Sequence, residues 1–168
     1  NVVKGQMGQT FHLDKAQMGI IATAGFWTYA LSVILNGPLA DRFGGRKAIL
    51  LGAVGAMLVN LLIGLLFLKG WSTKILVGMS LLYSVNMYFQ SFGALSVVKI
   101  NAAWFHVKER GVFGGIFGSM ISLGYFFAIS IGGWILAHFP MYMVFLIPSA
   151  AMAPMAMRSF AAKIADGR

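Results

Sequence analysis

The sequence predicts an all-α protein that crosses a lipid bilayer several times. Of its 168 residues, 59% are hydrophobic and only 10% are charged, whereas about a quarter of the residues in an ordinary soluble domain are charged. The apolar residues also gather in long segments, near the length of about 20 residues that a spanning helix needs. We therefore expect a polytopic transmembrane helical bundle in an integral membrane protein.

We expect five spanning segments, which together form one bundle over residues 1–168. They cover residues 18–36, 48–68, 75–98, 112–137 and 141–157. The first segment has a start signal, because Asp14 can cap the free amides of the first turn and Gln17 completes the spacing of a capping box. The fifth segment is short and carries Pro148 and Pro154, which membrane helices tolerate when neighbouring groups satisfy the freed carbonyls.

Small residues recur along two of these segments and predict faces where helices pack. In the second segment the row is Gly52, Ala56, Asn60 and Gly64. The fourth segment carries two rows, Gly111, Gly115 and Ser119 beside Gly114, Gly118 and Ser122. Close backbone approach supplies much of the attraction between helices in lipid.

Basic residues lie between the apolar segments and set the expected orientation. If residues 36–47 are cytoplasmic, the inside carries Arg42, Arg46, Lys47, Lys108, Arg110, Arg158, Lys163 and Arg168, and the outside carries Lys4, Lys15, Lys69 and Lys74. The excess of basic residues on the inside favours this topology. It leaves the N-terminus outside, so we expect a further helix before Asn1 in a longer protein without a signal peptide. The scattered charges, net +9, argue against nucleic-acid binding.

Few groups could support catalysis or bind a metal. The acids are Asp14, Asp41, Glu109 and Asp166, the histidines are His12, His106 and His138, and there is no cysteine. No pair of these groups has the spacing of a general acid and base or of a metal site. We therefore expect no enzyme, no catalytic residue, no metal and no cofactor.

Residues 37–47 read Gly-Pro-Leu-Ala-Asp-Arg-Phe-Gly-Gly-Arg-Lys, and they resemble the loop between the second and third helices of the major facilitator superfamily. A second stretch is similar to the fourth helix and following loop of the organophosphate:phosphate antiporters and of related sugar-phosphate permeases and sensors. The similarity lies in residues 88–93, Lys99, Trp104, Phe105 and residues 108–111. The resemblance implies helices two to six of an N-terminal half, with the C-terminal half absent, in a plasma or bacterial inner membrane.

The resemblance also bears on the solute. In those antiporters a basic residue and a histidine help to bind phosphate, and the matching positions here are Val33 and Ile121. An unchanged phosphate site is therefore not expected.

The loop suggests a latch at the cytoplasmic end. A carboxylate such as Asp41 can pair with arginine or accept from the free amides of a helix start. We expect Asp41, Arg42, Arg46 and Glu109 to close in the outward-facing state and to separate when the transporter opens inward. The alternative is a solvated loop whose charges only set topology. The full predicted gating set is Gly37, Asp41, Arg42, Gly44, Arg46, Lys47, Glu109 and Arg110.

Polar residues inside the apolar segments are candidates for a solute path, because polar groups facing lipid are costly. The candidates are Tyr29, Ser32, Tyr83, Asn86, Gln90, Lys99, Ser122 and Tyr125. Each could instead make a hydrogen bond between helices. Lys99, near a segment end, could reach the headgroups or meet an anionic solute.

These features predict part of a secondary transporter that moves a small solute, for which an anion is one candidate, by alternating access. Its partners would be the lipid bilayer, the solute and the missing C-terminal bundle. A transporter-like membrane sensor that binds a ligand and signals to a partner is the alternative, and a helical scaffold without a ligand is a third possibility.

Overall fold

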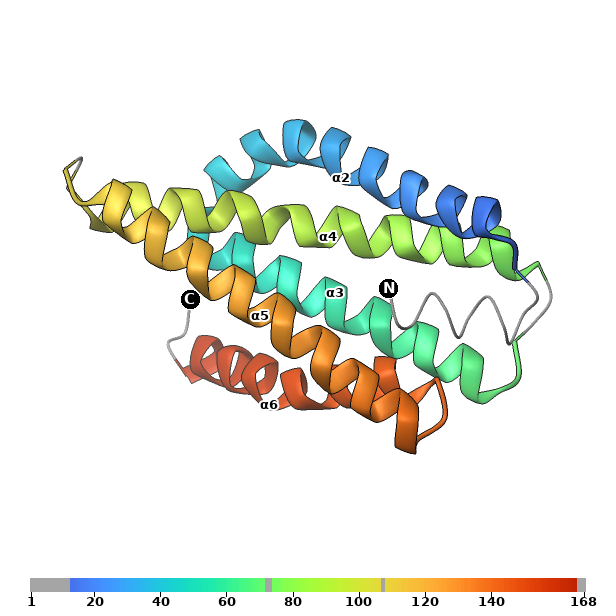
Figure 1. Ribbon diagram of the computed structural model, residues 1–168. Coiled ribbons are helices and arrows are strands. Elements are labelled where there is room, and N and C mark those ends of the chain that lie inside the picture. The colour runs from blue at the N-terminus through green and yellow to red at the C-terminus, as the bar shows by residue number, and fades with distance from the viewer. Residues whose placement is uncertain (1–12, 72–73, 107, 166–168) are drawn as a thin grey trace.

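The computed structural model describes residues 13–71, 74–106 and 108–165. Every regular secondary-structure element within these residues is an α-helix (Figure 1). The helices are α2 (Lys15–Phe43), α3 (Gly45–Leu68), α4 (Ile75–Trp104), α5 (Arg110–His138) and α6 (Met143–Ala165). Each of the five predicted spans overlaps one of these helices. The predicted all-α helical bundle is therefore confirmed. The predictions made for Lys4, His12, Asp166 and Arg168 lie outside the described residues.

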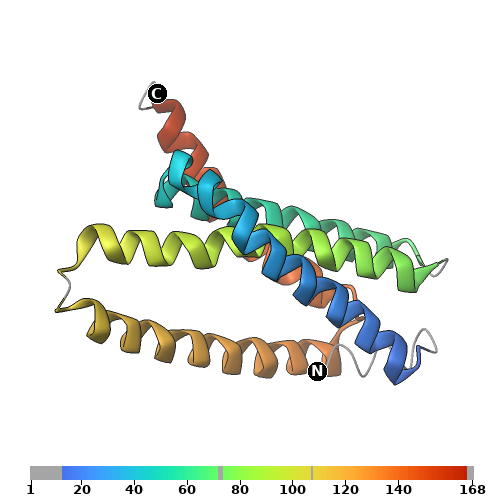
Figure 2. The same ribbon diagram turned by 90° about the horizontal axis from the view of Figure 1, so that it is seen from above.

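The helices lie side by side, with successive connections at opposite ends (Figure 1). The α2–α3 and α4–α5 connections share one end, and the α3–α4 and α5–α6 connections share the other. α4 packs against both α2 and α3, and α3 also packs against α6. α5 stands apart from α4 along most of its length (Figure 2). This separation leaves one side of α4 open toward α5.

The start of α2 follows the predicted capping box. The Asp14 carboxylate accepts from the backbone N–H of Lys15 at 2.6 Å, and the Gln17 side chain accepts from the backbone N–H of Asp14 at 3.0 Å. These bonds satisfy amide donors that the first turn would otherwise leave unpaired. The predicted N-terminal signal is confirmed.

The end of α2 differs from the prediction, because the helix continues past Asn36 through Pro38 to Phe43. Pro38 removes one intrahelical hydrogen bond, and such a loss bends a helix more often than it ends one in a membrane; α2 is arched in Figure 1. The predicted loop over residues 36–47 is thereby reduced to Gly44, with φ 76° and ψ 155°. This conformation is essentially restricted to glycine.

Apolarity differs among the helices. Within the described residues, three segments are long and apolar enough to cross a bilayer by length and composition, namely Lys15–Phe43, Gly45–Leu68 and Gly111–His138. α6 contributes a shorter apolar stretch, Met143–Pro154. α4 is 30 residues long but buries Asn86, Ser91 and Ser96, so polar side chains that face the bundle lower its hydropathy. Crossing of the bilayer by α4 and α6 stays a prediction.

The small-residue row of α3 packs as predicted. A Cβ added at Gly52 would lie 2.7 Å from the Phe89 carbonyl oxygen of α4, and one added at Gly64 would lie 2.6 Å from Leu146 of α6. Such close approach requires the absence of a side chain. The prediction for the rows of α5 is wrong for the described structure, because no atom lies within 4 Å of a Cβ built at Gly111, Gly114, Gly115 or Gly118.

The apolar core forms two clusters at opposite ends of the bundle. One comprises Ile21, Val59, Ile63, Phe67, Ile75 and Met79, near the α3–α4 connection. The other comprises Ala40, Ala48 and Phe92, near the α2–α3 turn. Along α4, Asn86 lies between Met79 of the first cluster and Phe92 of the second. A polar layer therefore separates the two apolar clusters.

Candidate functional site

The polar layer contains a chain of amide side chains that joins α3 to α4. Gln90 donates from Nε2 to Asn86 Oδ1 at 2.5 Å, and Asn86 donates from Nδ2 to Asn60 Oδ1 at 3.2 Å. The same Nδ2 donates to the backbone carbonyl of Ala56, also at 3.2 Å. We call Asn60, Asn86 and Gln90 the amide ladder. Asn86 is buried, with 3% of its surface exposed, and these bonds offset the cost of burying it.

Gln90 forms the exposed end of the amide ladder. The residue is exposed whereas Asn86 is buried and Asn60 is half-buried. Gln90 lies near the middle of α4. Because its amide nitrogen points toward Asn86, its carbonyl oxygen points away from the ladder.

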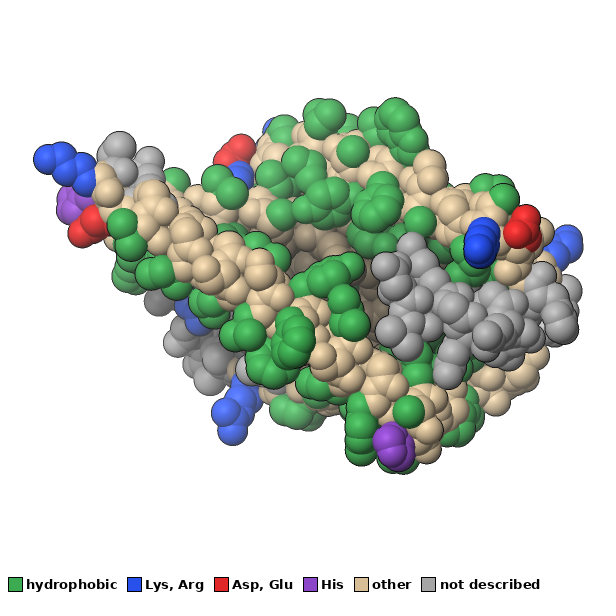
Figure 3. Space-filling model, viewed as in Figure 1, with side chains coloured by type: hydrophobic (Ala, Val, Ile, Leu, Met, Phe, Trp, Pro, Cys, Tyr) green, Lys and Arg blue, Asp and Glu red, His purple; other side chains and the backbone are tan. Residues whose placement is uncertain are grey.

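Two of the predicted tyrosines lie on different helices, Tyr83 half-buried on α4 and Tyr125 exposed on α5. Tyr83 packs against α2, since a Cβ built at Gly25 would lie 2.3 Å from its ring. Tyr83 and Gln90 are seven residues apart, which places them on one face of α4. Figure 3 shows the surface hollowed between α5 and the side formed by α2 and α4.

The other predicted path residues are placed differently. Ser32 is buried at 3% exposure on the α2 face that also buries Asn36 and Ala40, so it belongs to a helix contact. Ser122 donates to the Gly118 carbonyl of its own helix at 3.1 Å. Tyr29 is half-buried on α2. The structure thus joins Asn86 to Gln90, with Tyr83 on the same face of α4, whereas Ser32 faces a helix contact and Ser122 bonds within its own helix.

A second polar contact, which the sequence analysis missed, joins α2 to α4. Asn36 is fully buried and donates from Nδ2 to Ser91 Oγ at 2.8 Å and to the Tyr88 carbonyl at 3.4 Å. Ser32, Asn36 and Ala40 follow each other at intervals of four residues, and this row of two polar residues and an alanine was the available signal. The contact holds α2 and α4 together as one unit.

The α2–α3 turn is attached to α4 by an ion pair. Lys99 of α4 pairs with Asp41 and also donates to the Gly37 carbonyl at 3.3 Å. The side chain of Lys99 is 25% exposed and that of Asp41 is 75% exposed. A Cβ built at Gly45 would lie 3.0 Å from Ile100 and 3.3 Å from the Ser96 carbonyl, so glycine lets α3 start directly against α4.

The partners expected for Asp41 differ from those observed. Among the described residues the Lys99–Asp41 contact is the ion pair that is found, and Arg42, Arg46 and Lys47 are exposed. Glu109 instead accepts from the backbone N–H of His106 at 3.1 Å. Lys99 reaches Asp41 because the two residues lie near the C-terminal ends of α4 and α2, which pack against each other. Arg110 begins α5, and its side chain is outside the described set.

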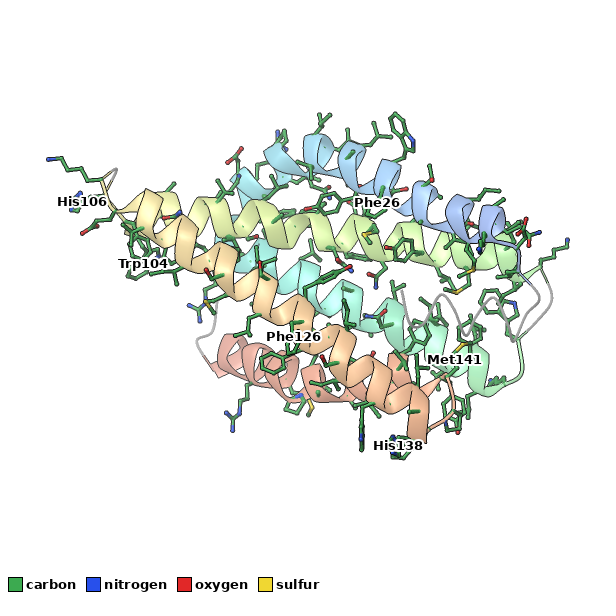
Figure 4. The ribbon with its side chains drawn as sticks, viewed as in Figure 1. Phe26, Trp104, His106, Phe126, His138 and Met141 are labelled. Carbon is green, nitrogen blue, oxygen red and sulfur yellow. The ribbon has the colours of Figure 1, made fainter. Side chains whose placement is uncertain are left out.

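The two described histidines lie at opposite ends of α5 (Figure 4). His106 lies at the α4–α5 connection, and His138 lies at the opposite end of α5 (Figure 4). The His138 ring contacts the Trp134 carbonyl at 2.9 Å and stacks on the Trp134 ring. These two histidines therefore share no site.

Comparison with known proteins gives relatives and a family. The chain is 29% identical over 112 residues to the membrane sensor protein UhpC of Salmonella typhimurium. The matched part is 67% of this chain and 24% of the relative. It is 25% identical over 128 residues to a probable hexose phosphate transport protein of Chlamydia pneumoniae, with 72% and 27% covered. It is 31% identical over 119 residues to the probable galactarate/D-glucarate transporter GudP of Pseudomonas putida, with 71% and 26% covered.

The chain spans about a quarter of the length of these curated relatives. No solved structure matches it. The family whose sequence pattern matches is described as the Major Facilitator Superfamily, and the match extends over residues 1–164. With a helical bundle, apolar spanning helices and the glycine-dependent turn after Asp41 already established, the chain is an integral membrane protein that belongs to the major facilitator superfamily.

Proposed function

We propose that this chain forms helices two to six of the first bundle of a secondary transporter, which moves a small organic anion by alternating access. The observation that carries the proposal is the Lys99–Asp41 ion pair at the end predicted to face the cytoplasm. It attaches the turn between α2 and α3 to α4, at the motif by which the chain resembles its family. Relatives named for the transport of hexose phosphate and of galactarate or D-glucarate support an anionic solute.

The ion pair suits a contact that opens and closes during each transport cycle. Asp41 is largely exposed, and an exposed pair contributes about 0.2 to 1 kcal/mol. A contact of this size changes the ratio of two conformations by up to about fivefold, because 1.4 kcal/mol corresponds to a factor of ten. The pair therefore biases the loop toward α4 without trapping it.

Lys99 also offers a positively charged group that the anion can bind. It is the cation within the apolar part of α4, and it is bound to Asp41 when the turn lies against α4. An organic anion that entered from the cytoplasmic side would compete with the Asp41 carboxylate for the same ammonium group. Binding of the solute and release of the turn would then be coupled.

The test uses the full-length protein reconstituted in vesicles, with solute counterflow as the readout and site-specific labels on both sides to measure the inward and outward populations. Asp41→Asn and Lys99→Met are each expected to shift these populations by up to about fivefold. The charge exchange Asp41→Lys with Lys99→Asp should restore the wild-type balance. Unchanged counterflow and populations in Asp41→Asn would refute the gating role.

A membrane sensor is the second candidate function, favoured by the similarity to UhpC, which is named as a sensor. A sensor would bind the solute without net flux and would signal through its cytoplasmic loops. The same vesicles decide between the two, because ligand binding without counterflow of any solute would favour the sensor over the transporter.

A further inference from the structure

We infer that Asn60 is a positioning residue, which acts through Asn86 to hold the Gln90 carbonyl oxygen toward the solute, and that this oxygen selects solutes bearing hydroxyl groups. The inference rests on the proposed transport of an organic anion and deepens it. The sequence analysis placed Asn60 only in a row of small packing residues. The structure instead makes it the α3 end of the amide ladder.

The hydrogen-bond directions along the ladder are linked. An amide side chain donates through nitrogen and accepts through oxygen. Asn86 uses its nitrogen for Asn60 Oδ1 and the Ala56 carbonyl, so its oxygen is directed toward Gln90. Gln90 must then present its nitrogen to Asn86. If Asn60 did not accept, Asn86 would keep only its bond to the Ala56 carbonyl, and its hold on the Gln90 amide would be weaker.

The orientation decides which chemical group Gln90 can recognise. Its free carbonyl oxygen accepts hydrogen bonds and cannot donate them. The carboxylates or phosphate of an organic anion are themselves acceptors, so they do not fit this oxygen. The hydroxyl groups of the same anion can donate to it. The ladder therefore favours a hydroxylated anion over one of the same length and charge without hydroxyls.

The position of Gln90 supports this role. It is exposed, it shares a face of α4 with Tyr83, and α5 stands apart from α4 along most of its length (Figure 2). Val85, which is 44% exposed, lies on the opposite face of α4. Gln90 is therefore expected to meet water and solute, and Val85 is expected to meet lipid.

The first experiment measures solute preference by the full-length protein in vesicles. The probes are D-glucarate against adipate, which has the same carbon chain and two carboxylates but no hydroxyls, and a hexose monophosphate against its deoxy analogue. The ratio of kcat/KM within each pair is the readout, because a merely structural defect lowers both members equally. We expect Gln90→Leu to reduce the preference for the hydroxylated member by about three- to tenfold, and Asn60→Leu to reduce it in the same direction.

The matched control is Ser80→Ala, because Ser80 donates only to the Leu76 carbonyl of its own helix, and its ratio should equal the wild-type ratio. If Asn60→Leu does not fold, Asn60→Ala is measured in the same way.

A wild-type ratio in Asn60→Leu with a lowered ratio in Gln90→Leu overturns the positioning role. A wild-type ratio in both overturns the inference entirely. If the protein transports other solutes but neither probe pair, hydroxyl selection is overturned and the proposed transport function stands. If no solute shows counterflow, the proposed transport function is overturned.

The second experiment needs no solute. Gln90→Cys and Val85→Cys, in a cysteine-free full-length background, are exposed to a membrane-impermeant thiol reagent. We expect position 90 to react and position 85 to stay unreacted. Reaction at position 85 alone, or at neither position, would place Gln90 away from water and overturn the inference.

Discussion

Replacing Gly52 by alanine tests whether α3 and α4 meet through their backbones. A Cβ at this position would lie 2.7 Å from the Phe89 carbonyl oxygen and 3.1 Å from the Phe92 Cβ. Ordinary contact begins near 3.4 Å, so α3 and α4 would have to separate by about 0.7 Å. Neither obstacle is the end of a flexible side chain. Forcing extra volume into such a packed contact costs about 1 to 3 kcal/mol.

Gly93→Ala is the matched control for this substitution. It also replaces a glycine in a helix, but no atom lies within 4 Å of a Cβ built there. Both variants gain about 1 kcal/mol of helix propensity, so that gain cancels in their difference. We expect Gly52→Ala to be less stable than Gly93→Ala by about 1 to 3 kcal/mol. The free energy of unfolding is measured by denaturant titration in mixed micelles. Equal stability of the two variants would refute the close contact.

Three further substitutions test other contacts, with the same unfolding titration as the measurement. Asp14→Ala should lose about 1 kcal/mol by removing the cap of α2, whereas Asp14→Asn should lose less; equal losses would mean that the cap contributes nothing. Asn36→Leu should cost about 1 to 3 kcal/mol, because Ser91 loses the bond it accepts and keeps only its own bond to the Tyr88 carbonyl, and because leucine adds volume; a variant as stable as wild type would contradict that contact. Gly64→Ala should cost less than Gly52→Ala, since its nearest neighbour is the flexible end of Leu146; a larger cost would contradict this comparison.

The motif after α2 shows how far a sequence pattern can be interpreted. Residues 37–47 indicate the family, and that indication is confirmed. They do not look helical, because glycine and proline usually interrupt helices. In the structure α2 continues through Pro38, and Gly44 alone makes the turn. A packed neighbour, α4, stabilises those last turns of α2, and no local pattern contains that information.

The partner of Asp41 was also beyond the sequence. Arg42 and Arg46 are near it in the chain, whereas Lys99 is 58 residues away. Ion pairs form between groups that the fold brings together, so a partner this distant along the chain could not be identified from the sequence, and the predicted latch with Arg42, Arg46 and Glu109 stays a prediction. The polar residues of α4 were easier, because Tyr83, Asn86 and Gln90 share a helical face that can be worked out from a spacing of three and four residues.

The sequence by itself determined the membrane environment, the helical class, the cap of α2 and the family, because apolar length, composition and short motifs act locally along the chain. The tertiary structure alone decided that Asn60 joins Asn86 and Gln90, that Asn36 bonds Ser91, and that α5 leaves its small residues uncovered. These outcomes depend on how helices cross and rotate against each other. Their side chains can satisfy buried polar groups in several ways, and only the packed bundle selects one.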